Sequence, residues 1–576
     1  MNKKYTYILL IFSVFIINSA GFTQKLFQKN DYNSPVNLPL FLSGTFGELR
    51  SDHFHSGLDV RTDGMEGIEI YSIDDGWVSR IIVAPNGYGN VIFITHPTGF
   101  ISVYAHLDAY EEKITSFVKN IQYRRHSFSV DIFPERTQFP VSKGDLIGFS
   151  GNTGGSEGAH LHFEIRDAGT NNILNPLKYF SNIKDTINPE IYHLAVFPLD
   201  KNRFKLSGSY SKVFNIRGNE GKYSITPDKI IKIGGDFGLG IGLYDFFNES
   251  WNRCGAYSIE LLIDEERVYY HTFDEFSFNE TRYLNSLVDY KAWQNNLRLQ
   301  KSFIEPNNKL SIYNYTKNNG KVSFKDYEVH NGKYIVKDLH GNISILDFLL
   351  QKDSTEWNFQ KEDSLPESQK KYMTWLHNNT YSNDGFLIDV PGNALYDSIL
   401  FTYNVVDTTD IFYSPIHIVH NKYVPLHTSY AISIKTRGLP KHLQNKALIT
   451  GLDEEGEFIP LGGKWHNGFI NTRLREFGNF TVIIDTLAPE IIAMDIDSMN
   501  NFIDTSEIKF IIKDDLSGIA KFEGKIDGKW VLFEYDQKND LIIYKFDKEK
   551  LNTDIEHQLV LTVTDNKNNV AVFSSK

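Results

Sequence analysis

A short segment of the chain occurs twice, at two widely separated positions. Residues 185–191 read DTINPEI, and residues 485–491 read DTLAPEI. Each copy is followed by an apolar stretch with a turn (231–241 and 511–519), and each ends on a Val-x-Asp triplet with an asparagine four residues later, Asp338 with Asn342 and Asp565 with Asn569. Two copies of one folding unit explain this repeat. The short strands between turns predict a β-sandwich-like, Ig-like module for each copy.

The length of the chain sets how many such units it contains. At 576 residues it is too long for one hydrophobic core, and we expect about three to five domains. Phenylalanine and tyrosine are abundant, at 42 and 31 residues, and aromatic side chains fit pleated half-buried surfaces, so the chain is predicted to be mainly β. The predicted division is a signal peptide at 1–24, a Gly-rich antiparallel β-sheet domain at 25–182, an Ig-like module at 185–350, a polar linker at 351–383, a β module at 384–484 and a second Ig-like module at 485–576.

The first residues carry a targeting signal. Lys3 and Lys4 precede an apolar stretch at 7–17, and small residues follow at 19–21, which is the order of a cleaved secretory signal peptide. The apolar stretch is shorter than the roughly 20 residues that cross a bilayer, so a retained anchor is the weaker alternative. We therefore expect an exported protein of the periplasm or cell envelope, without a stable transmembrane anchor.

The net charge and the cysteine content limit the possible partners of the protein and the bonds that can stabilise it. A formal net charge of −13 argues against nucleic acid as a partner, because neutralising phosphates requires clustered Lys and Arg. The single cysteine, Cys254, cannot form an internal disulfide, and we expect it to be a buried apolar side chain. An exported protein without disulfides must depend on packed cores and on metal ions.

Histidines gather in three short segments of the Gly-rich domain. The first segment is HSGLD, from His55 to Asp59; the second is YAHL, which contains His106; the third is GAHLHFE, which contains His160 and His162. A catalytic zinc ion takes three protein ligands from His, Asp and Glu and leaves one position for water. Residues two apart on a strand share a face, so His160 and His162 can serve one site, and a bend at the glycine can bring His55 and Asp59 together. Any one of these pairs alone is more often a surface or structural pair.

Together these segments resemble the lysostaphin/LytM-type family of zinc endopeptidases. The resemblance includes more than the histidines and runs in order over the domain: HSGLD, the Asp-Gly turn at 75–76, GYGN at 87–90, YAHL at 104–107, Gly-Asp at 144–145, GNTGGSEGAHLHFEIR at 151–166 and Asn-Pro at 175–176. It implies a small antiparallel β-sheet crossed by a groove. Residue by residue, it implies one Zn²⁺ per chain held by His55, Asp59 and His162. It also implies that His106 and His160 orient or deprotonate the water and stabilise the developing oxyanion.

The family's substrate is the peptide of peptidoglycan, in its cross-links or stem peptides, and export agrees with that substrate. Degenerate family members have lost metal ligands and activate other wall hydrolases, whereas every matched ligand is present here. An active zinc metalloendopeptidase is therefore the first hypothesis. The rival hypothesis is a non-catalytic envelope interaction protein, or an activator of amidases, that uses the peptidase fold for docking. The β modules carry no chemical motif, and we expect them to bind envelope partners or to act as spacers.

Several neighbouring residues admit two interpretations. His53 would share a face with His55 in an extended segment, but we expect a surface or supporting role for it, and Glu164 is expected to be structural and not a general base. Residues 108–140 form an insertion relative to the family, containing a stretch at 114–121 that can be helical; it is either a wall over the groove or a peripheral excursion. The acidic pair Asp514-Asp515 suggests Ca²⁺, but acidic turn residues in β modules are more often simply turn formers.

Overall fold

A computed structural model describes residues 32–199, 211–225, 229–353, 366, 369–407, 412–494, 506–547, 550–551 and 555–575. The signal peptide expected at 1–24 lies outside these residues, as does most of the polar linker's first half. Among the described residues no helix is long and apolar enough to cross a membrane.

The N-terminal domain is built on one large antiparallel sheet. Its strand order is β1 (Leu42–Gly44), β2 (Leu58–Arg61), β11 (His160–Asp167), β6 (Phe100–Ala105), β5 (Val91–Thr95), β4 (Gly76–Val83) and β8 (Val130–Ile132), and β9 (Pro140–Val141) and β12 (Ile173–Leu174) pair at its margins. A smaller sheet, β3 (Glu69–Tyr71), β10 (Leu146–Ser150) and β7 (Leu107–Tyr110), lies beside it. Buried apolar side chains such as Ile92, Leu161 and Phe163 fill the core between the elements. Strand β11 therefore lies in the interior of the sheet, between β2 and β6.

The insertion forms a helix, α1 (Glu112–Arg125), followed by β8. The side chain of Glu111 accepts the amide proton of Lys113 at the helix start, and His126 ends the helix in the left-handed conformation. Ile114, Val118 and Ile121 recur at helical spacing and are buried in the core of the N-terminal domain. One face of α1 is thus anchored, and the opposite face is available for a second contact.

The next module packs two sheets around a core that includes Leu239, Leu261 and Tyr334. One sheet has the order β14 (Lys212–Asn215), β13 (Glu190–Pro198), β18 (Phe237–Tyr244) and β22 (Gln300–Lys301). The other has the order β15 (Arg217–Asn219), β16 (Lys222–Ser224), β25 (Ile343–Lys352), β24 (Val329–Lys337), β19 (Ser258–Ile263), β20 (Glu266–Thr272) and β23 (Tyr313–Thr316), with β17 (Ile230–Ile233) also on β25. The same part of the chain contains the short segments η3 (Phe278–Tyr283), α2 (Leu284–Leu287), α3 (Tyr290–Gln294), η4 (Asn318–Gly320) and β21 (Glu275–Phe276). Strand β21 pairs with β12 of the N-terminal domain.

Two further sandwiches complete the chain. The first sheet of the middle module has the order β26 (Lys370–Met373), β29 (Ile399–Val406), β30 (Ile416–Val419), β36 (Gly478–Ile484), β32 (Ala447–Leu452) and β33 (Phe458–Pro460). Its second sheet has the order β27 (Asn379–Asn383), β28 (Phe386–Val390), β31 (Tyr430–Lys435), β35 (Phe469–Leu474) and β34 (Lys464–His466). The first sheet of the C-terminal module has the order β37 (Glu490–Ala493), β38 (Glu507–Lys513), β42 (Leu541–Lys545) and β41 (Glu534–Asp536). Its second sheet has the order β40 (Lys529–Val531), β39 (Ile519–Ile526), β43 (Leu559–Asp565) and β44 (Val570–Ser575). The remaining 3-10 segments described are η1 (Pro176–Lys178), η6 (Lys441–Lys446) and η7 (Gln537–Asn539). The prediction of a mainly β chain with several sheets after the first domain is confirmed.

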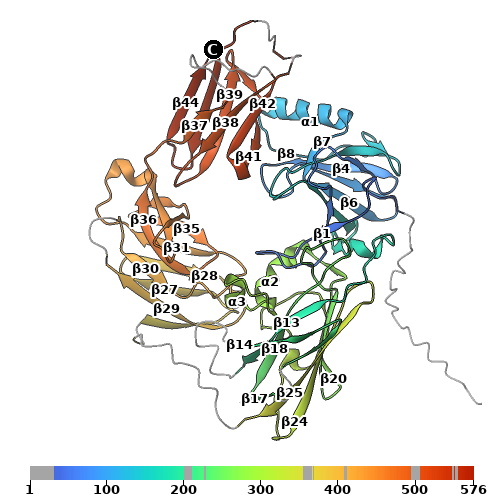
Figure 1. Cartoon of the computed structure of the whole chain (residues 1–576). Helices are drawn as coiled ribbons and strands as arrows, with labels where there is room; N and C mark the ends of the chain where they lie inside the picture. Colours follow the sequence, from blue (N-terminus) through green and yellow to red (C-terminus); the bar gives the residue numbers. More distant parts are fainter. Residues whose placement is uncertain are drawn as a thin grey trace, which may run out of the picture.

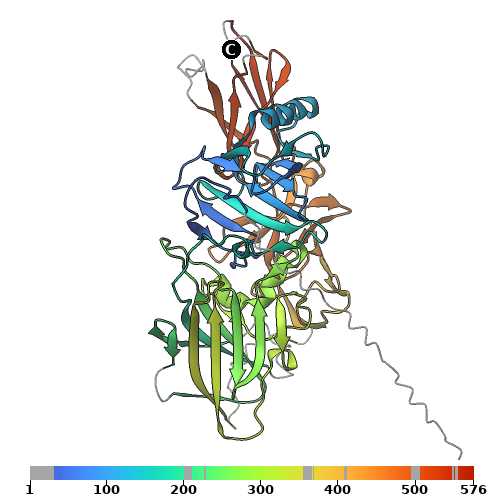
Figure 2. The same cartoon turned by 90° about the vertical axis from the view of Figure 1, so that its right-hand side faces the viewer.

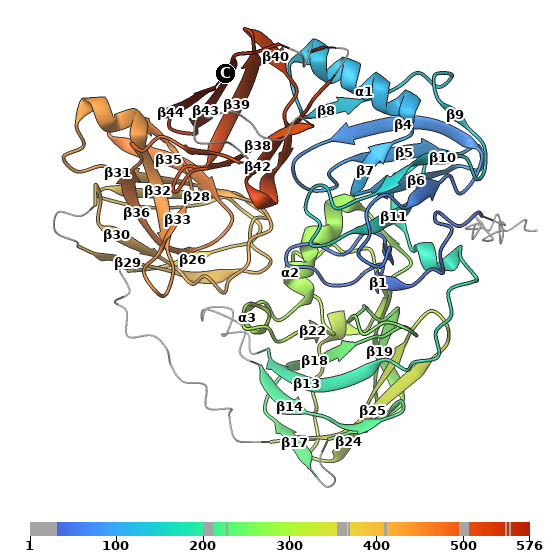
Figure 3. The same ribbon diagram turned by 45° about the horizontal axis from the view of Figure 1, so that its top comes forward.

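The modules are arranged as a ring, because the C-terminal module returns to the N-terminal domain (Figure 1). The ring of Trp530 stacks on His126 at the end of α1, with centroids 5.3 Å apart, and Asp547 pairs with Lys119 at 2.8 Å. Lys538 donates hydrogen bonds to the carbonyl oxygens of Ser156, at 2.8 Å, and Asn152. Two further views show α1 beside the C-terminal module (Figures 2 and 3). The insertion therefore contacts the far end of the same chain.

Candidate metal centre

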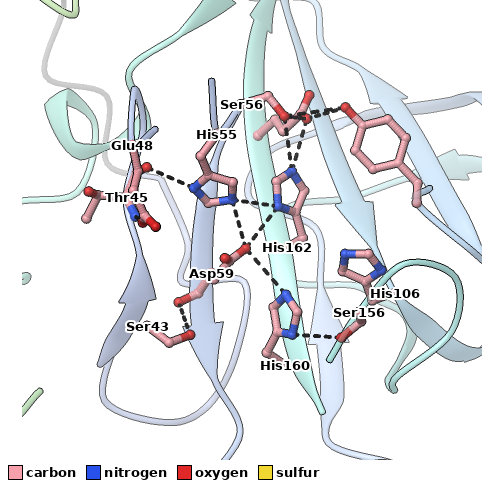
Figure 4. A network of polar contacts seen from close by, with 12 residues as sticks. Ser43, Thr45, Glu48, His55, Ser56, Asp59, His106, Ser156, His160 and His162 are labelled. Carbon is pink, nitrogen blue, oxygen red and sulfur yellow. Dashed lines mark hydrogen bonds and ion pairs between the residues drawn. The ribbon is translucent and has the colours of Figure 1, made fainter. Parts of the chain in front are cut away.

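Strand register brings the three segments of the first domain together. On one side of β11, His162 is paired with Asp59 of β2, and on the other side it is paired with Ala105 of β6, the residue before His106. His55 lies in the loop that leads into β2 and faces the same point (Figure 4). Segments remote in the sequence thus converge because three strands are neighbours in one sheet.

The side-chain atoms of His55, Asp59 and His162 lie within hydrogen-bond distance of one another. His55 Nε2 is 2.9 Å from Asp59 Oδ1 and 3.0 Å from His162 Nδ1, and His162 Nδ1 is 3.0 Å from Asp59 Oδ1. All three residues are buried, with exposed fractions of 5%, 8% and 5%. They are one of the groups of His and acidic residues in the described structure whose ligand atoms are close enough to hold a metal ion.

The other nitrogen of each histidine is held by an acceptor. His55 Nδ1 is 2.8 Å from the carbonyl oxygen of Thr45, and His162 Nε2 is 3.0 Å from Glu164 Oε1. A carbonyl or carboxylate oxygen only accepts, so these nitrogens carry the protons, and His55 Nε2 and His162 Nδ1 present lone pairs. Outer partners of this kind fix the tautomer of a metal-binding histidine. Two imidazole lone pairs and a carboxylate oxygen then face one another, and a divalent cation is the partner that satisfies all three.

The donor set and its charge therefore fit zinc. Two nitrogens and one carboxylate oxygen leave a fourth position open, which is the composition of catalytic zinc sites. Burial alone would lower the pKa of His162, but Asp59 and Glu164 outweigh it and raise that pKa to about 9, so the position favours positive charge. Burial alone would raise the pKa of Asp59, but the surrounding histidines hold it well below its usual value. Burial lowers the pKa of His55.

Arginine and glutamate side chains support the centre from outside. Arg50 donates from Nη2 to Asp59 Oδ2 at 2.8 Å, leaving Oδ1 for the centre. Glu164 is fully buried and accepts from Ser56 Oγ at 2.5 Å, Tyr88 OH at 2.6 Å and Arg166 Nε at 2.7 Å. Because every oxygen of Glu164 is occupied by these donors and by His162, it is a structural residue, as expected. Neither Arg50 nor Tyr88 was predicted from the sequence.

His106 and His160 lie beside the three ligands (Figure 4). His106 Nδ1 donates to the carbonyl oxygen of Thr153 at 2.8 Å, and His160 Nδ1 is 2.8 Å from the carbonyl oxygen of Gly158. Their rings are 4.9 Å apart, and His160 Nε2 is 3.4 Å from Asp59 Oδ1. Burial, reinforced by the charges of the neighbouring histidines, lowers the pKa of His106 to about 3, so its imidazole is neutral near pH 7.

His53 is not part of this centre. Its side chain is 47% exposed, and its Nδ1 is 2.8 Å from Asp52 Oδ1 at the surface. His53 lies in the bend at 51–53, which is closed by the antiparallel bridge between Leu49 and Phe54. The surface role expected for His53 agrees with this position.

The antiparallel sheet thus carries a buried His-Asp-His group that could hold a metal ion, with two further histidines beside it. The peptidase family M23 model matches residues 53–123, and the chain carries an M23 domain of the lysostaphin/LytM type near its N-terminus. The resemblance inferred from the motifs is thus confirmed. A second model, the Zu5-like domain, matches residues 370–485 in the middle module.

Individual proteins similar to this chain include cell-wall enzymes and an activator of such enzymes. The DD-carboxypeptidase/endopeptidase Mpg of Neisseria meningitidis serogroup B is 29% identical over 147 residues, which are 25% of this chain and 28% of that protein. The murein hydrolase activator NlpD of Escherichia coli K12 is 35% identical over 138 residues, 23% of this chain and 28% of that protein. The chain thus spans less than a third of the length of these relatives. The solved catalytic domain of lysostaphin from Staphylococcus simulans is 21% identical over 24% of this chain and 91% of that domain, with a TM-score of 0.19.

Proposed function

We propose that this protein is an exported zinc metalloendopeptidase that hydrolyses peptide cross-links or stem peptides of peptidoglycan. One zinc ion per chain would be held by His55 Nε2, Asp59 Oδ1 and His162 Nδ1. The observation that carries the proposal is the convergence of these three buried lone-pair donors, each fixed by a partner on its far side. When bound, zinc lowers the pKa of water toward about 7 and polarises the scissile carbonyl.

His106 and His160 supply the remaining chemistry in this proposal. Each has its Nδ1 beside a backbone carbonyl, so each carries its proton there. His106 thereby leaves Nε2 free toward the substrate position, whereas His160 Nε2 lies 3.4 Å from Asp59 Oδ1. A neutral His106 accepts the proton of the attacking water, and the protonated ring then stabilises negative charge on the tetrahedral intermediate. The kinked backbone at His106, with a φ of 60°, turns the imidazole away from strand β6 and toward β11.

The substrate class rests on the names of the relatives. Mpg is a DD-carboxypeptidase/endopeptidase, and NlpD is a murein hydrolase activator. Both names concern the cell wall, which supports peptidoglycan as the target. The 35% identity to NlpD also supports a second candidate function, an activator of wall hydrolases that does not itself cut. The complete set of ligands in this chain favours the enzyme.

The β modules would position the enzyme in the envelope. They include the Zu5-like domain and the two repeat modules, and together they form most of the ring (Figure 1). Export by the N-terminal signal would place the protein in the periplasm or envelope, where these modules meet their partners.

Zinc content and digestion of purified sacculi test the proposal together. The wild-type protein should bind one zinc ion and release new amino termini from peptidoglycan. His162→Ala should lose both properties, whereas His106→Ala and His160→Ala should retain zinc and lose activity. The proposal fails if the zinc-loaded wild-type protein cuts nothing and instead activates an amidase, which is the outcome that the second candidate requires.

A further inference from the structure

One loop of the M23 domain carries the backbone carbonyl groups that orient both histidines beside the metal centre. This loop, residues 151–159, joins β10 to β11. The carbonyl oxygen of Thr153 accepts the Nδ1 proton of His106 at 2.8 Å. The carbonyl oxygen of Gly158 accepts the Nδ1 proton of His160, also at 2.8 Å. Because such an acceptor fixes the tautomer and the direction of an imidazole, the position of the loop sets where the two rings point.

The loop is rich in glycine and depends on its surroundings for support. Four of its nine residues are glycine, which has the largest conformational freedom of any residue. A turn of the M23 domain holds the middle of the loop, because the amide of Gly155 donates to the carbonyl oxygen of Gly87 at 2.8 Å. The amide of Asn90 donates to Thr153 Oγ1 at 2.9 Å. These bonds hold residues 153–155 from one side, and the C-terminal module contacts the residues that flank them.

Lys538 of the C-terminal module bridges the two flanking residues. It lies in η7, the turn between β41 and β42, and its Nζ donates to the carbonyl oxygens of Asn152 and Ser156, the latter at 2.8 Å. An ammonium group has three donors and no acceptor, so two backbone carbonyls suit it as partners. The two acceptors are 386 and 382 residues away from Lys538 in the sequence. One side chain from the far end of the chain therefore closes the glycine-rich segment at both ends.

The contact reaches both histidines through few bonds. Ser156 is buried, and its Oγ donates at 2.7 Å to the carbonyl oxygen of Gly158, the same oxygen that accepts from His160. On the other side, Asn152 directly precedes the residue whose carbonyl oxygen orients His106. Displacement of either end of the segment would thus shift an imidazole that lies beside the metal centre.

Other contacts also dock the C-terminal module on the M23 domain. Trp530 stacks on His126, and Asp547 pairs with Lys119 of α1. Substitution of Lys538 should therefore change the loop and leave the module in place.

We propose that Lys538 is a positioning residue of the active site: it holds loop 151–159 so that both histidines beside the metal centre keep their direction. This inference rests on the proposed function, hydrolysis at that centre. The C-terminal module would then complete the active site instead of acting only as a spacer. The closed ring would be the most active form of the chain.

Turnover of a soluble, cross-linked peptidoglycan fragment by the zinc-loaded full chain tests the proposal. Lys538→Met removes both hydrogen bonds and keeps the aliphatic part of the side chain. Its kcat should fall about 10-fold with little change in KM, since a displacement of about 1 Å costs up to about 10²-fold in rate. Zinc content should stay at the wild-type level, because the three proposed ligands lie outside the loop. Lys538→Arg keeps a cationic donor and should restore most of the activity.

Hydrogen exchange of backbone amides gives a second readout that does not depend on activity. In Lys538→Met, exchange in residues 151–159 should become about 10-fold faster, whereas exchange in α1 should stay unchanged. The matched control is Lys525→Met. It breaks an ion pair with Glu523, 2.9 Å long, that lies within the C-terminal module, and it should match the wild type in both assays.

The proposal is overturned if Lys538→Met keeps the wild-type kcat, or if exchange in residues 151–159 stays unchanged. A rise in kcat would overturn it too, because the C-terminal module would then restrain the active site. Equally faster exchange in α1 would show that the lysine only docks the module. A wild-type protein that cuts nothing marks failure of the proposed function instead, and hydrogen exchange then decides whether Lys538 holds the loop.

Discussion

Glu164→Gln tests whether the carboxylate behind His162 controls metal binding. In the wild type, Glu164 Oε1 accepts the Nε2 proton of His162 at 3.0 Å, and Oε2 accepts from Arg166 Nε at 2.7 Å. Glutamine can retain the first contact, but its amide group then faces the guanidinium of Arg166, donor against donor. The substitution also removes the negative charge that makes His162 a more basic ligand.

The structure separates two effects of this substitution. Arg166 is 6% exposed, and breaking a buried ion pair costs about 3–5 kcal/mol. Because Arg166 keeps its contact with Tyr88, at 3.1 Å, we expect the lower end of this range, a loss of about 3 kcal/mol in the free energy of unfolding. Loss of an outer partner weakens metal binding by about 10–100-fold, equivalent to about 1.4–2.7 kcal/mol. Both losses are measurable in one protein.

Competition with a chelator of known zinc affinity measures the dissociation constant, and urea unfolding of the zinc-free protein measures stability. The double variant Glu164→Gln/Arg166→Met is the control, because it removes the unpaired guanidinium. Stability should then recover in part while zinc affinity stays low. The reasoning is refuted if Glu164→Gln binds zinc as tightly as the wild type, or if affinity returns together with stability in the double variant.

Three further predictions concern other parts of the chain. Trp530→Ala removes two aromatic contacts with α1, which together contribute about 2 kcal/mol. Amide hydrogen exchange in the last turn of α1 should become about 30-fold faster. Unchanged exchange would show that Trp530 contributes nothing to the docking of the C-terminal module on α1. Cys254 is 2% exposed and burial raises the pKa of its thiol, so iodoacetamide should leave it unmodified in the native protein and alkylate it in urea; rapid native labelling would contradict its burial. Burial lowers the pKa of His420 to about 3, so as pH falls below about 6.5 this histidine takes up a proton in the unfolded chain but not in the folded one. The free energy of unfolding should therefore be lower by about 2 kcal/mol at pH 5 than at pH 7. The variant His420→Gln should lose less stability between pH 7 and pH 5, and an equal loss would exclude this histidine as the cause.

The sequence predicted the proposed metal ligands better than it predicted the residues that hold those ligands in place. HSGLD and HLHFE name the proposed ligands because each pair is local, and the spacing of two in His160 and His162 places both on one face of β11. Arg50 could not be found in the same way, because its contact with Asp59 depends on how the loop before β2 folds back. Tyr88 reaches Glu164 only through the tertiary arrangement of a distant turn.

The same distinction holds for the fold. Alternating apolar residues and the repeated DTxxPE segment predicted β modules, since both are local patterns. The strand register then shows which aspartates are equivalent: Asp245 follows β18 and Asp514 follows β38. The helix of the insertion was also foreseeable from its spacing, but its contact with Trp530 joins residues at opposite ends of the chain, and no periodicity encodes such a pairing.

Closure of the modules into a ring has a consequence for a nicked protein. Each module is held by two neighbours, so one cut between modules leaves the fragments joined through the remaining contacts, among them the bonds from Lys538 to the loop before β11. The two fragments stay at a high effective concentration, so a contact that opens forms again before the fragments diffuse apart. A single proteolytic cut between modules therefore does not by itself release the M23 domain.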